Sequence, residues 1–356
     1  MNAVLIIDKP AGLTSHDVVN RARRILGERS IGHLGTLDPM ATGVLPLVTG
    51  NLTRLAQFYT ASEKIYEGTI RFGFATDTYD AEGESTTTPQ EVHLRSEEIE
   101  SLAARFRGVI EQIPPPFSAK KIKGVPAYKL ARQQKEVVLK PVQVEIKEFE
   151  ILAVDADRVR FRARVASGTY MRSVAHDMGR ELACGAHLES LRRTAVAEFT
   201  LADAHTLEQL ANLFHAGNHS CHPDRSASFL GGKTRRVEGP AVEPDGSEPG
   251  ARSFSRPLRE GGDVESLEAL FIHPRRLLPD FPSVTADEPT AARIRSGRTI
   301  NLPDLSRARQ VKVFASQRDL IAIATRLAGT LFHPTIVLCR TAPPRDKVGA
   351  DSVRRH

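Results

Sequence analysis

The amino-acid sequence predicts an α/β protein, of the α+β kind, in which a mixed, largely antiparallel sheet is flanked by helices and followed by a small β domain. Residues 64–74 and 158–165 alternate between apolar and polar side chains, which is the period-two pattern of half-buried strands. Residues 171–183 instead place apolar side chains at helical spacing. Three short strand-like runs between residues 310 and 339 indicate the second, smaller β unit.

The first fifty residues predict a strand, a helix and a second strand. Residues 3–8 are a short apolar run with no basic leader before it, so we expect a buried strand rather than a secretory signal. Thr14 and Asp17, three residues apart, form a capping box, and apolar residues follow at helical spacing as far as Leu26. Residues 44–48 predict the second strand, which is buried.

The composition narrows the class of protein. Hydrophobic residues make up 40% of the 356 residues, and no apolar run reaches the roughly 20 residues that span a bilayer. Three cysteines without a C-x-x-C pair indicate a reduced compartment, so we expect a cytoplasmic protein. Cys184 and His187 offer two ligands where a closed zinc site needs about four, which favours a buried thiol over a metal site.

The charge allows a polyanionic partner without requiring one. The formal net charge is +6, aromatic residues are only 6% and tryptophan is absent. A surface that stacks many bases on aromatic rings therefore fits poorly, and contacts from arginine and lysine to phosphates fit better.

Two strands are expected at 142–147 and 149–154, and a turn at 155–157 returns the chain into the strand over 158–165. The polar face of that last strand is a row of arginines: Arg158, Arg160, Arg162 and Arg164. The row is either a phosphate-facing strip or a solvated sheet face beside the acids of the neighbouring strand. We favour the second interpretation, because charged outer faces are usual in antiparallel sheets.

Changes in composition divide the chain into five parts. Residues 216–263 are rich in Gly, Pro, Ser, Arg and Glu and nearly lack aliphatic periodicity, which predicts a disordered insertion. The expected parts are a main domain at 1–215, the insertion at 216–263, the end of the main domain with a linker at 264–282, a small β domain at 283–340 that docks on the main domain, and a flexible tail at 341–356.

Residues 32–43, Gly-His-Leu-Gly-Thr-Leu-Asp-Pro-Met-Ala-Thr-Gly, are the most informative stretch of the chain. A segment so rich in glycine, with a proline, packs poorly as a helix or central strand, so we expect a loop that holds Asp38. Taken alone, an Asp-Pro pair is usually a turn residue or helix cap, and Tyr66 on an apolar strand face is usually a core residue. Arg172 lies near an expected helix start, where the helix dipole is unfavourable for a cation. This position slightly favours a functional role for Arg172.

Together with this loop, several further blocks resemble the TruB family of tRNA pseudouridine synthases in order and spacing. They lie at 64–66, 72–83, 112–121, 127–132, 167–173, 184–188 and 191–194. The resemblance runs from residue 3 to residue 215 and resumes weakly near residue 264. The segment 216–263 departs from the family's pattern.

The resemblance implies the pseudouridine synthase fold with a small PUA-like β domain after it. By motif position, Asp38 matches the catalytic aspartate, which acts as nucleophile on a flipped-out base. Arg172 would pair with Asp38 and orient it, and Tyr66 would stack on the base and serve in moving the proton on C5. The residues implied in binding the substrate are His33, Tyr66, Asp80, Tyr170 and Leu191.

The activity implied by the resemblance is isomerisation of uridine to pseudouridine in the T-loop of tRNA, at the position the family numbers 55. The reaction needs no redox step and no group donor, so neither a cofactor nor a metal is implied. We expect a monomer that binds the T stem-loop, with no obligatory protein partner and no membrane. Two alternatives stay open: pseudouridylation of another or guide-selected RNA, and a tRNA-binding folding helper without required catalysis.

Overall fold

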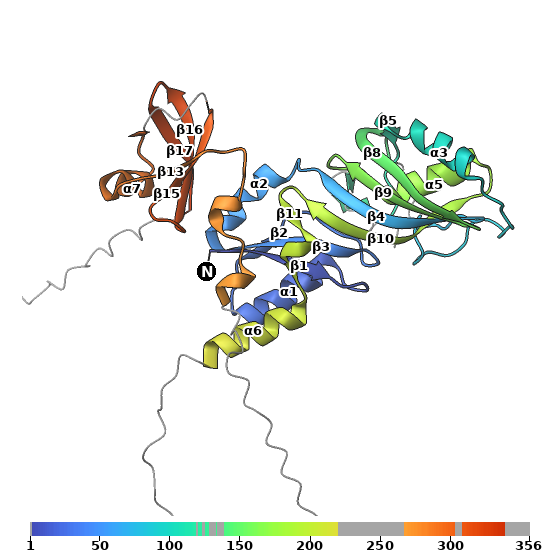
Figure 1. Ribbon diagram of the computed structural model, residues 1–356, viewed down its shortest axis with the longest axis horizontal. Coiled ribbons are helices and arrows are strands. Elements are labelled where there is room, and N and C mark those ends of the chain that lie inside the picture. Colours follow the sequence, from blue (N-terminus) through green and yellow to red (C-terminus); the bar gives the residue numbers. More distant parts are fainter. Residues whose placement is uncertain are drawn as a thin grey trace, which may run out of the picture.

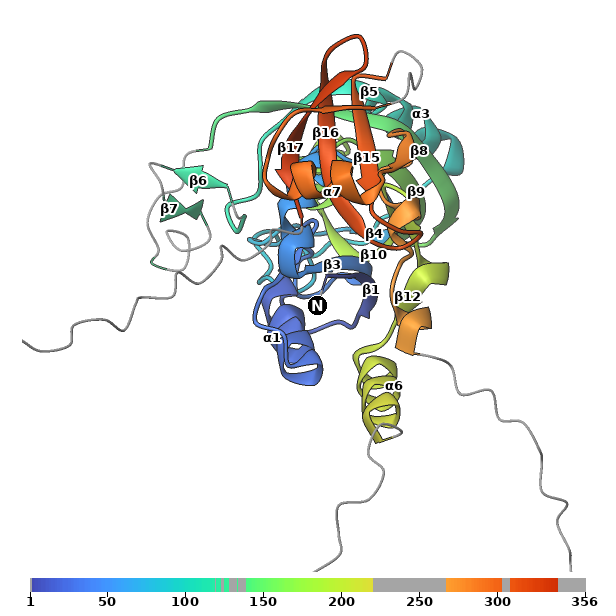
Figure 2. The same cartoon turned by 90° about the vertical axis from the view of Figure 1, so that its left-hand side faces the viewer.

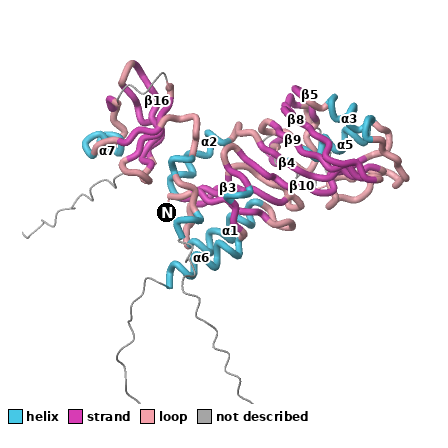
Figure 3. The backbone as a smooth tube through the Cα atoms, viewed as in Figure 1, coloured by secondary structure: helices cyan, strands magenta, loops and turns pink. Residues whose placement is uncertain are grey.

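The protein folds around one large mixed sheet, with a smaller five-stranded sheet at one end (Figure 1). The computed structural model describes residues 2–118, 120–122, 125–127, 133, 139–219, 267–302 and 308–338. Figure 3 shows strands through the middle of the larger body with helices around them, whereas the smaller body is mostly strand. A two-stranded ribbon, β6 (Lys121–Ile122) with β7 (Val125–Pro126), projects to one side in Figure 2.

The path through the large sheet is β12-β1-β3-β10-β4-β9-β8-β5, with β2 paired to β3 and β11 to β10. Among the described strands of this sheet, only the β1–β12 and β3–β10 pairs are parallel, so the expectation of a mixed, largely antiparallel sheet is confirmed. The strands are β1 (Val4–Lys9), β2 (Ile31–His33), β3 (Thr42–Thr49), β4 (Lys64–Phe72), β5 (Gly108–Gln112), β8 (Val142–Asp155), β9 (Arg158–Val165), β10 (Ala186–Val196), β11 (Phe199–Thr200) and β12 (Ala204–His205).

Helices cover the sheet and bury its apolar side chains in one main core. The helical segments of this body are α1 (Ser15–Leu26), η1 (Gly50–Leu55), α2 (Ala56–Tyr59), α3 (Ser96–Arg105), α5 (Met171–Glu181), η2 (Leu201–Asp203), α6 (Leu207–His219), η3 (Leu267–Leu270) and η4 (Pro274–Arg276). The capping box that predicted α1 is present: Thr14 Oγ1 accepts from Asp17 N at 3.1 Å, and Asp17 Oδ2 accepts from Thr14 N at 3.0 Å. Val18 of α1 and Val174 of α5 belong to the same apolar cluster.

The small domain has its own core and shares a second one with the large body. Its elements are β13 (Ser283–Thr285), α7 (Glu288–Arg295), β14 (Ile300–Asn301), β15 (Gln310–Phe314), β16 (Leu320–Ala328) and β17 (Leu331–Val337), with sheet order β13-β15-β16-β17-β14. Phe314 and Ile336 pack in one cluster with Leu52 and Tyr59 of the large body. The expected docking of this domain is therefore observed.

The structure corrects two details of the predicted strands. The runs 142–147 and 149–154 are one continuous strand, β8, because register shifts at Ile146/Glu148 and Ile151/Ala153 absorb the break in alternation. The alternation over 64–74 is also imperfect, because the charged Lys64 shares the buried face of β4 with the apolar side chains and Tyr66.

The arginine row has the solvated arrangement that we favoured. Arg164 pairs with Glu148 of β8 at 3.2 Å, and Arg158 pairs with Glu189 of β10 at 2.9 Å. Arg162 lies opposite both Glu67 and Glu150 in the strand register. Acids of β4, β8 and β10 therefore lie beside three of the four arginines, whereas Arg160 lies opposite Thr69 and Ala153.

The expected insertion at 216–263 lies outside the described residues, apart from 216–219, which continue α6. The expected tail at 341–356 also lies outside them. Within the described ranges, no helix is both long enough and apolar enough to cross a membrane.

Candidate active site

The loop that carries Asp38 is clamped at both ends by buried cations. Lys9, at the end of β1, is fully buried, and its ammonium donates to the carbonyls of Pro10, Pro39 and Ala41 at 3.0, 3.0 and 2.6 Å. The bonds from Lys9 to Pro39 and Ala41 fix the backbone after Asp38. The second cation is Arg193 of β10, which is 1% exposed.

Arg193 fixes the backbone on the other side of Asp38. Its guanidinium donates to the carbonyls of Gly35 and Thr36, before Asp38, at 3.1 and 3.2 Å. It also donates to the carbonyl of Val44, in β3 after Asp38, at 2.8 Å. Ser15 Oγ also accepts from Leu37 N at 2.8 Å. The residues between β2 and β3 therefore hold one conformation without regular secondary structure, because their carbonyls are satisfied by side chains.

Glycine is required where this loop enters β3. Gly43 has φ +100, and a Cβ there would collide with the carbonyl oxygen of Arg193. We predict that Gly43→Ala lowers the free energy of unfolding by about 3 kcal/mol, since it adds an overpacked contact to a strained backbone. Urea denaturation measures the change. Gly12→Ala, which also has positive φ but nothing within 4 Å of the new Cβ, separates the collision from the strain.

The buried ammonium of Lys9 makes stability depend on pH. Burial lowers the pKa of Lys9 from 10.5 to about 8, against the opposing pull of Asp38. The unfolded chain holds more protons than the folded protein between these values, so this group's contribution to the free energy of unfolding rises from pH 8 to 10.5.

We therefore predict that the free energy of unfolding of the wild type, relative to Lys9→Met, grows by about 1–2 kcal/mol between pH 7.5 and 9.5. Urea denaturation at both pH values measures it. Lys147→Met is the control, because Glu63 raises the pKa of the Lys147 ammonium rather than lowering it. A difference that stays constant for Lys9→Met would contradict the prediction.

Arg172, at the start of α5, links two carboxylates. Its Nε lies 2.9 Å from Asp38 Oδ2, and its Nη1 lies 3.4 Å from Asp80 Oδ2. The same guanidinium donates to the carbonyls of Thr78 and Phe117 at 3.1 and 3.0 Å. A cation near a helix start opposes the helix dipole, so the two carboxylates supply the balancing charge.

Burial raises the pKa of the Asp38 carboxyl above its usual value, and Asp80 adds to that rise. Arg172 acts in the opposite direction and favours the ionised form. The Asp38 side chain is 34% exposed whereas that of Arg172 is 4% exposed. One side of the Asp38 carboxylate thus contacts a buried cation, while another side remains accessible.

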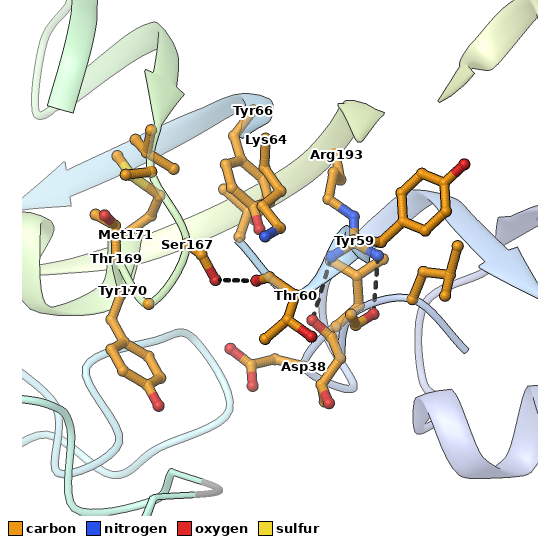
Figure 4. A pocket seen from close by; sticks show the side chains of 18 of the residues that line it. Asp38, Tyr59, Thr60, Lys64, Tyr66, Ser167, Thr169, Tyr170, Met171 and Arg193 are labelled. Carbon is orange, nitrogen blue, oxygen red and sulfur yellow. Dashed lines mark hydrogen bonds between the residues drawn. The ribbon is translucent and has the colours of Figure 1, made fainter. Parts of the chain in front are cut away.

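Asp38 faces a pocket of about 420 Å³. The lining includes five of the other residues singled out from the sequence, namely His33, Tyr66, Tyr170, Arg172 and Leu191. In Figure 4, Asp38, Tyr66 and Tyr170 approach the pocket from three separate elements: the loop after β2, the strand β4 and the N-terminus of α5. Asp80 is buried behind Arg172 and is not part of the lining.

Sequence reasoning gave no role to Lys9, Lys64 or Arg193. Lys64 lines the pocket and donates to Ser62 O at 2.5 Å, and burial lowers its pKa to about 8. The position of Lys64 two residues before Tyr66 was a signal that could have placed both side chains on the same strand face. Arg193 could have been found through the matched block that contains it. Lys9 had no such signal, because a lysine before a proline gives no local sign of burial.

Within the part of the chain that the structure describes, no three His, Cys, Asp or Glu side chains are grouped as metal ligands would be. Cys184 is half-buried, which raises the pKa of its thiol. His187 instead places Nδ1 3.2 Å from the carbonyl of Phe74.

Comparisons with known proteins identify the family. The model "TruB family pseudouridylate synthase (N terminal domain)" matches residues 23–171, and "tRNA pseudouridylate synthase B C-terminal domain" matches residues 172–227. A protein of Solibacter usitatus named tRNA pseudouridine synthase B is 45% identical over 95% of this chain and 100% of its own length. The chain belongs to the TruB family. It is therefore an enzyme of the pseudouridine synthase class.

Another TruB relative, from Mycobacteroides abscessus and also named tRNA pseudouridine synthase B, is 48% identical over 59% of this chain and 72% of its own length. Among solved structures, a chain of a "Cbf5-Nop10-Gar1 Complex" superposes with a TM-score of 0.63 at 20% identity, covering 95% of this chain and 85% of that one. This likeness shows a shared fold and confirms the expected pseudouridine synthase architecture.

Proposed function

We propose that the protein isomerises uridine to pseudouridine in the T-loop of tRNA, at the position the TruB family numbers 55, with Asp38 as the nucleophile. The observation that carries the proposal is the Asp38–Arg172 ion pair of 2.9 Å at the edge of a pocket that Tyr66, Tyr170 and Leu191 also line. The names of the relatives support tRNA as the substrate.

The pocket favours a single extruded nucleotide. Its volume of about 420 Å³ is enough for one nucleoside, and its walls combine aromatic rings and aliphatic side chains with one carboxylate and three cationic side chains. A uridine stacked in an RNA helix could not reach Asp38, so the base must leave the stack. His33 also lines the pocket, and in this proposal it contacts the RNA that the base has left.

The reaction is an internal rearrangement in which one glycosidic bond replaces another. The C1′–N1 bond breaks, the uracil turns, a C1′–C5 bond forms and the proton on C5 moves to N1 by way of a base or solvent. Asp38 attacks either C1′ or C6 and leaves again unchanged, so no electrons or groups are gained or lost.

Four other residues support this chemistry. Arg172 orients the Asp38 carboxylate and favours its ionised form, which is the attacking form. Tyr66 stacks on the uracil and, through its hydroxyl, assists removal of the C5 proton. Tyr170 and Leu191 complete the walls around the base.

The test uses unmodified tRNA carrying tritium at C5 of its uridines, because isomerisation replaces the C5–H bond by a C5–C1′ bond and so releases that label to water. We expect the purified protein alone to release label from the wild-type transcript and from an isolated T stem-loop. A transcript with the T-loop target uridine changed to cytidine should release none. Release from that transcript would show that the target lies elsewhere.

The same assay decides between the alternatives. Release that appears only when a guide RNA is added would favour the guide-selected reaction. Binding of tRNA without release, by wild type and Asp38→Ala alike, would favour the folding helper.

We propose a monomer without an obligatory protein partner, and light scattering of the active preparation tests this. We further propose residues 1–215 as the catalytic domain and 283–340 as the accessory β domain.

A further inference from the structure

The loop after β4 contains a strained residue beside the active site. Tyr79 has φ +65, in the left-handed region that residues other than glycine rarely adopt. Its ring stacks on the imidazole of His176 of α5, with ring centroids 3.8 Å apart and planes 13° apart. A strained backbone persists only where its surroundings hold it, and this ring stack is part of what holds it.

Both neighbours of Tyr79 in the chain contact Arg172. The carbonyl of Thr78 accepts from Arg172 Nη1 at 3.1 Å, and Asp80 Oδ2 lies 3.4 Å from the same nitrogen. His176 follows Arg172 by four residues on α5, so the two side chains lie on the same helical face, one turn apart. The ring stack therefore joins the loop to the helix next to the guanidinium.

The opposite side of the loop is fixed to β10. Leu188 N donates to the carbonyl of Tyr79 at 3.0 Å, and Ala81 N donates to the carbonyl of Leu188 at 3.0 Å. The backbone of residues 79–81 is thus held by a strand, while the Tyr79 ring is held by a helix. Neither Tyr79 nor His176 lines the pocket, so neither would touch the base bound there.

His176 is not needed here as a hydrogen-bonding group. Its Nδ1 is buried and has no hydrogen-bond partner among the described residues, and burial lowers its pKa, which favours the neutral ring. An unpaired buried nitrogen is unfavourable, so the ring surface is the part of the side chain that contributes.

We propose that the Tyr79–His176 stack is a positioning clamp that holds residues 78–80 against Arg172 and so fixes the guanidinium that pairs with Asp38. Tyr79 and His176 are positioning residues, acting through Arg172. The inference rests on the proposed role of Asp38 as nucleophile.

The test compares variants that remove a ring with variants that keep it. His176→Ala removes the imidazole. Tyr79→Gly removes the phenol and at the same time relieves the left-handed strain, so any loss cannot come from added strain. His176→Phe and Tyr79→Phe keep a ring at each position. Phe149→Leu is the control, since it disrupts the Phe149–Phe161 ring pair elsewhere in the core.

We expect His176→Ala and Tyr79→Gly to lower kcat about tenfold, the factor that corresponds to the energy of one aromatic pair. KM should stay within about twofold, because uniform binding of the RNA is unchanged. The Phe variants should keep wild-type kcat, and Phe149→Leu should lower the melting temperature without changing kcat.

The pH profile gives a readout that a merely structural role would not move. The charged groups around Asp38 are Arg172, Asp80 and Lys9, and Glu82 also senses the Asp38 charge. Arg172 lowers the pKa of Asp38, so a loosened guanidinium should let that pKa rise. The acid limb of kcat should therefore move to higher pH in His176→Ala and Tyr79→Gly, and not in the Phe variants.

Two results would overturn the clamp. One is a folded His176→Ala with the wild-type kcat and acid limb. The other is an equal loss in His176→Ala and His176→Phe, which would assign the effect to the ring nitrogens. Failure of the proposed function is separate, because the wild type itself would then release no tritium from tRNA.

Discussion

Asp38→Asn is expected to reduce tritium release from tRNA by at least about 10⁴-fold, because an amide cannot replace a carboxylate as a nucleophile. The asparagine side chain has the same shape as the aspartate side chain. The substitution also removes a charge from a site where burial already raises the pKa of the carboxyl. The fold should therefore tolerate the change, and the dissociation constant for tRNA should stay within about threefold.

Single-turnover release and filter binding measure these two quantities. Asp280→Asn, at an exposed position, is the matched control. A rate for Asp38→Asn above about 1% of wild type would rule out Asp38 as the nucleophile. In the wild type, the acid limb of kcat should lie above the usual aspartate pKa of about 4, because activity is lost as pH falls through the raised pKa.

Arg172→Met is expected to affect both stability and activity. It leaves Asp38 and Asp80 without their shared cation, and removing one partner from a buried ion pair costs about 3–5 kcal/mol. The rate should fall about 10³-fold, since the nucleophile loses its orienting charge. Arg172→Lys should recover little, because a single ammonium cannot also reach Thr78 and Phe117.

A double variant separates the two effects. Adding Asp80→Asn to Arg172→Met removes one uncompensated buried charge, so it should restore part of the free energy of unfolding without restoring the rate. Urea denaturation and tritium release are measured on the same preparations. If Asp80→Asn restores no stability, uncompensated charge is not the reason for the loss.

Much of the fold followed from local patterns. The capping box at Thr14 and Asp17 begins α1, and the alternation over 158–165 became β9, because both signals depend on residues only a few positions apart. The break in the apolar–polar alternation between residues 147 and 149 led to the wrong prediction of two strands where β8 is one. A bulge lets a strand continue although its side chains change face. The shared core that holds the small domain has no local signal at all.

The candidate site divides in the same way. Motif positions singled out Asp38, Tyr66 and Arg172, and these three line one pocket. Their catalytic roles are still predictions, which the variants above test. Lys9 was missed, because its burial depends on carbonyls about thirty residues away that accept from its ammonium.

By itself, the sequence determined where strands and helices form and which loop carries the aspartate, because backbone geometry and glycine or proline content act locally. Only the tertiary structure decided how Asp38 ionises and which face of it is open. Its pKa depends on burial and on charges from α5, β1 and the loop after β4, and these groups are far apart in the chain. Electrostatic interactions weaken with distance in space, so these charges influence Asp38 only once folding has brought them close to it.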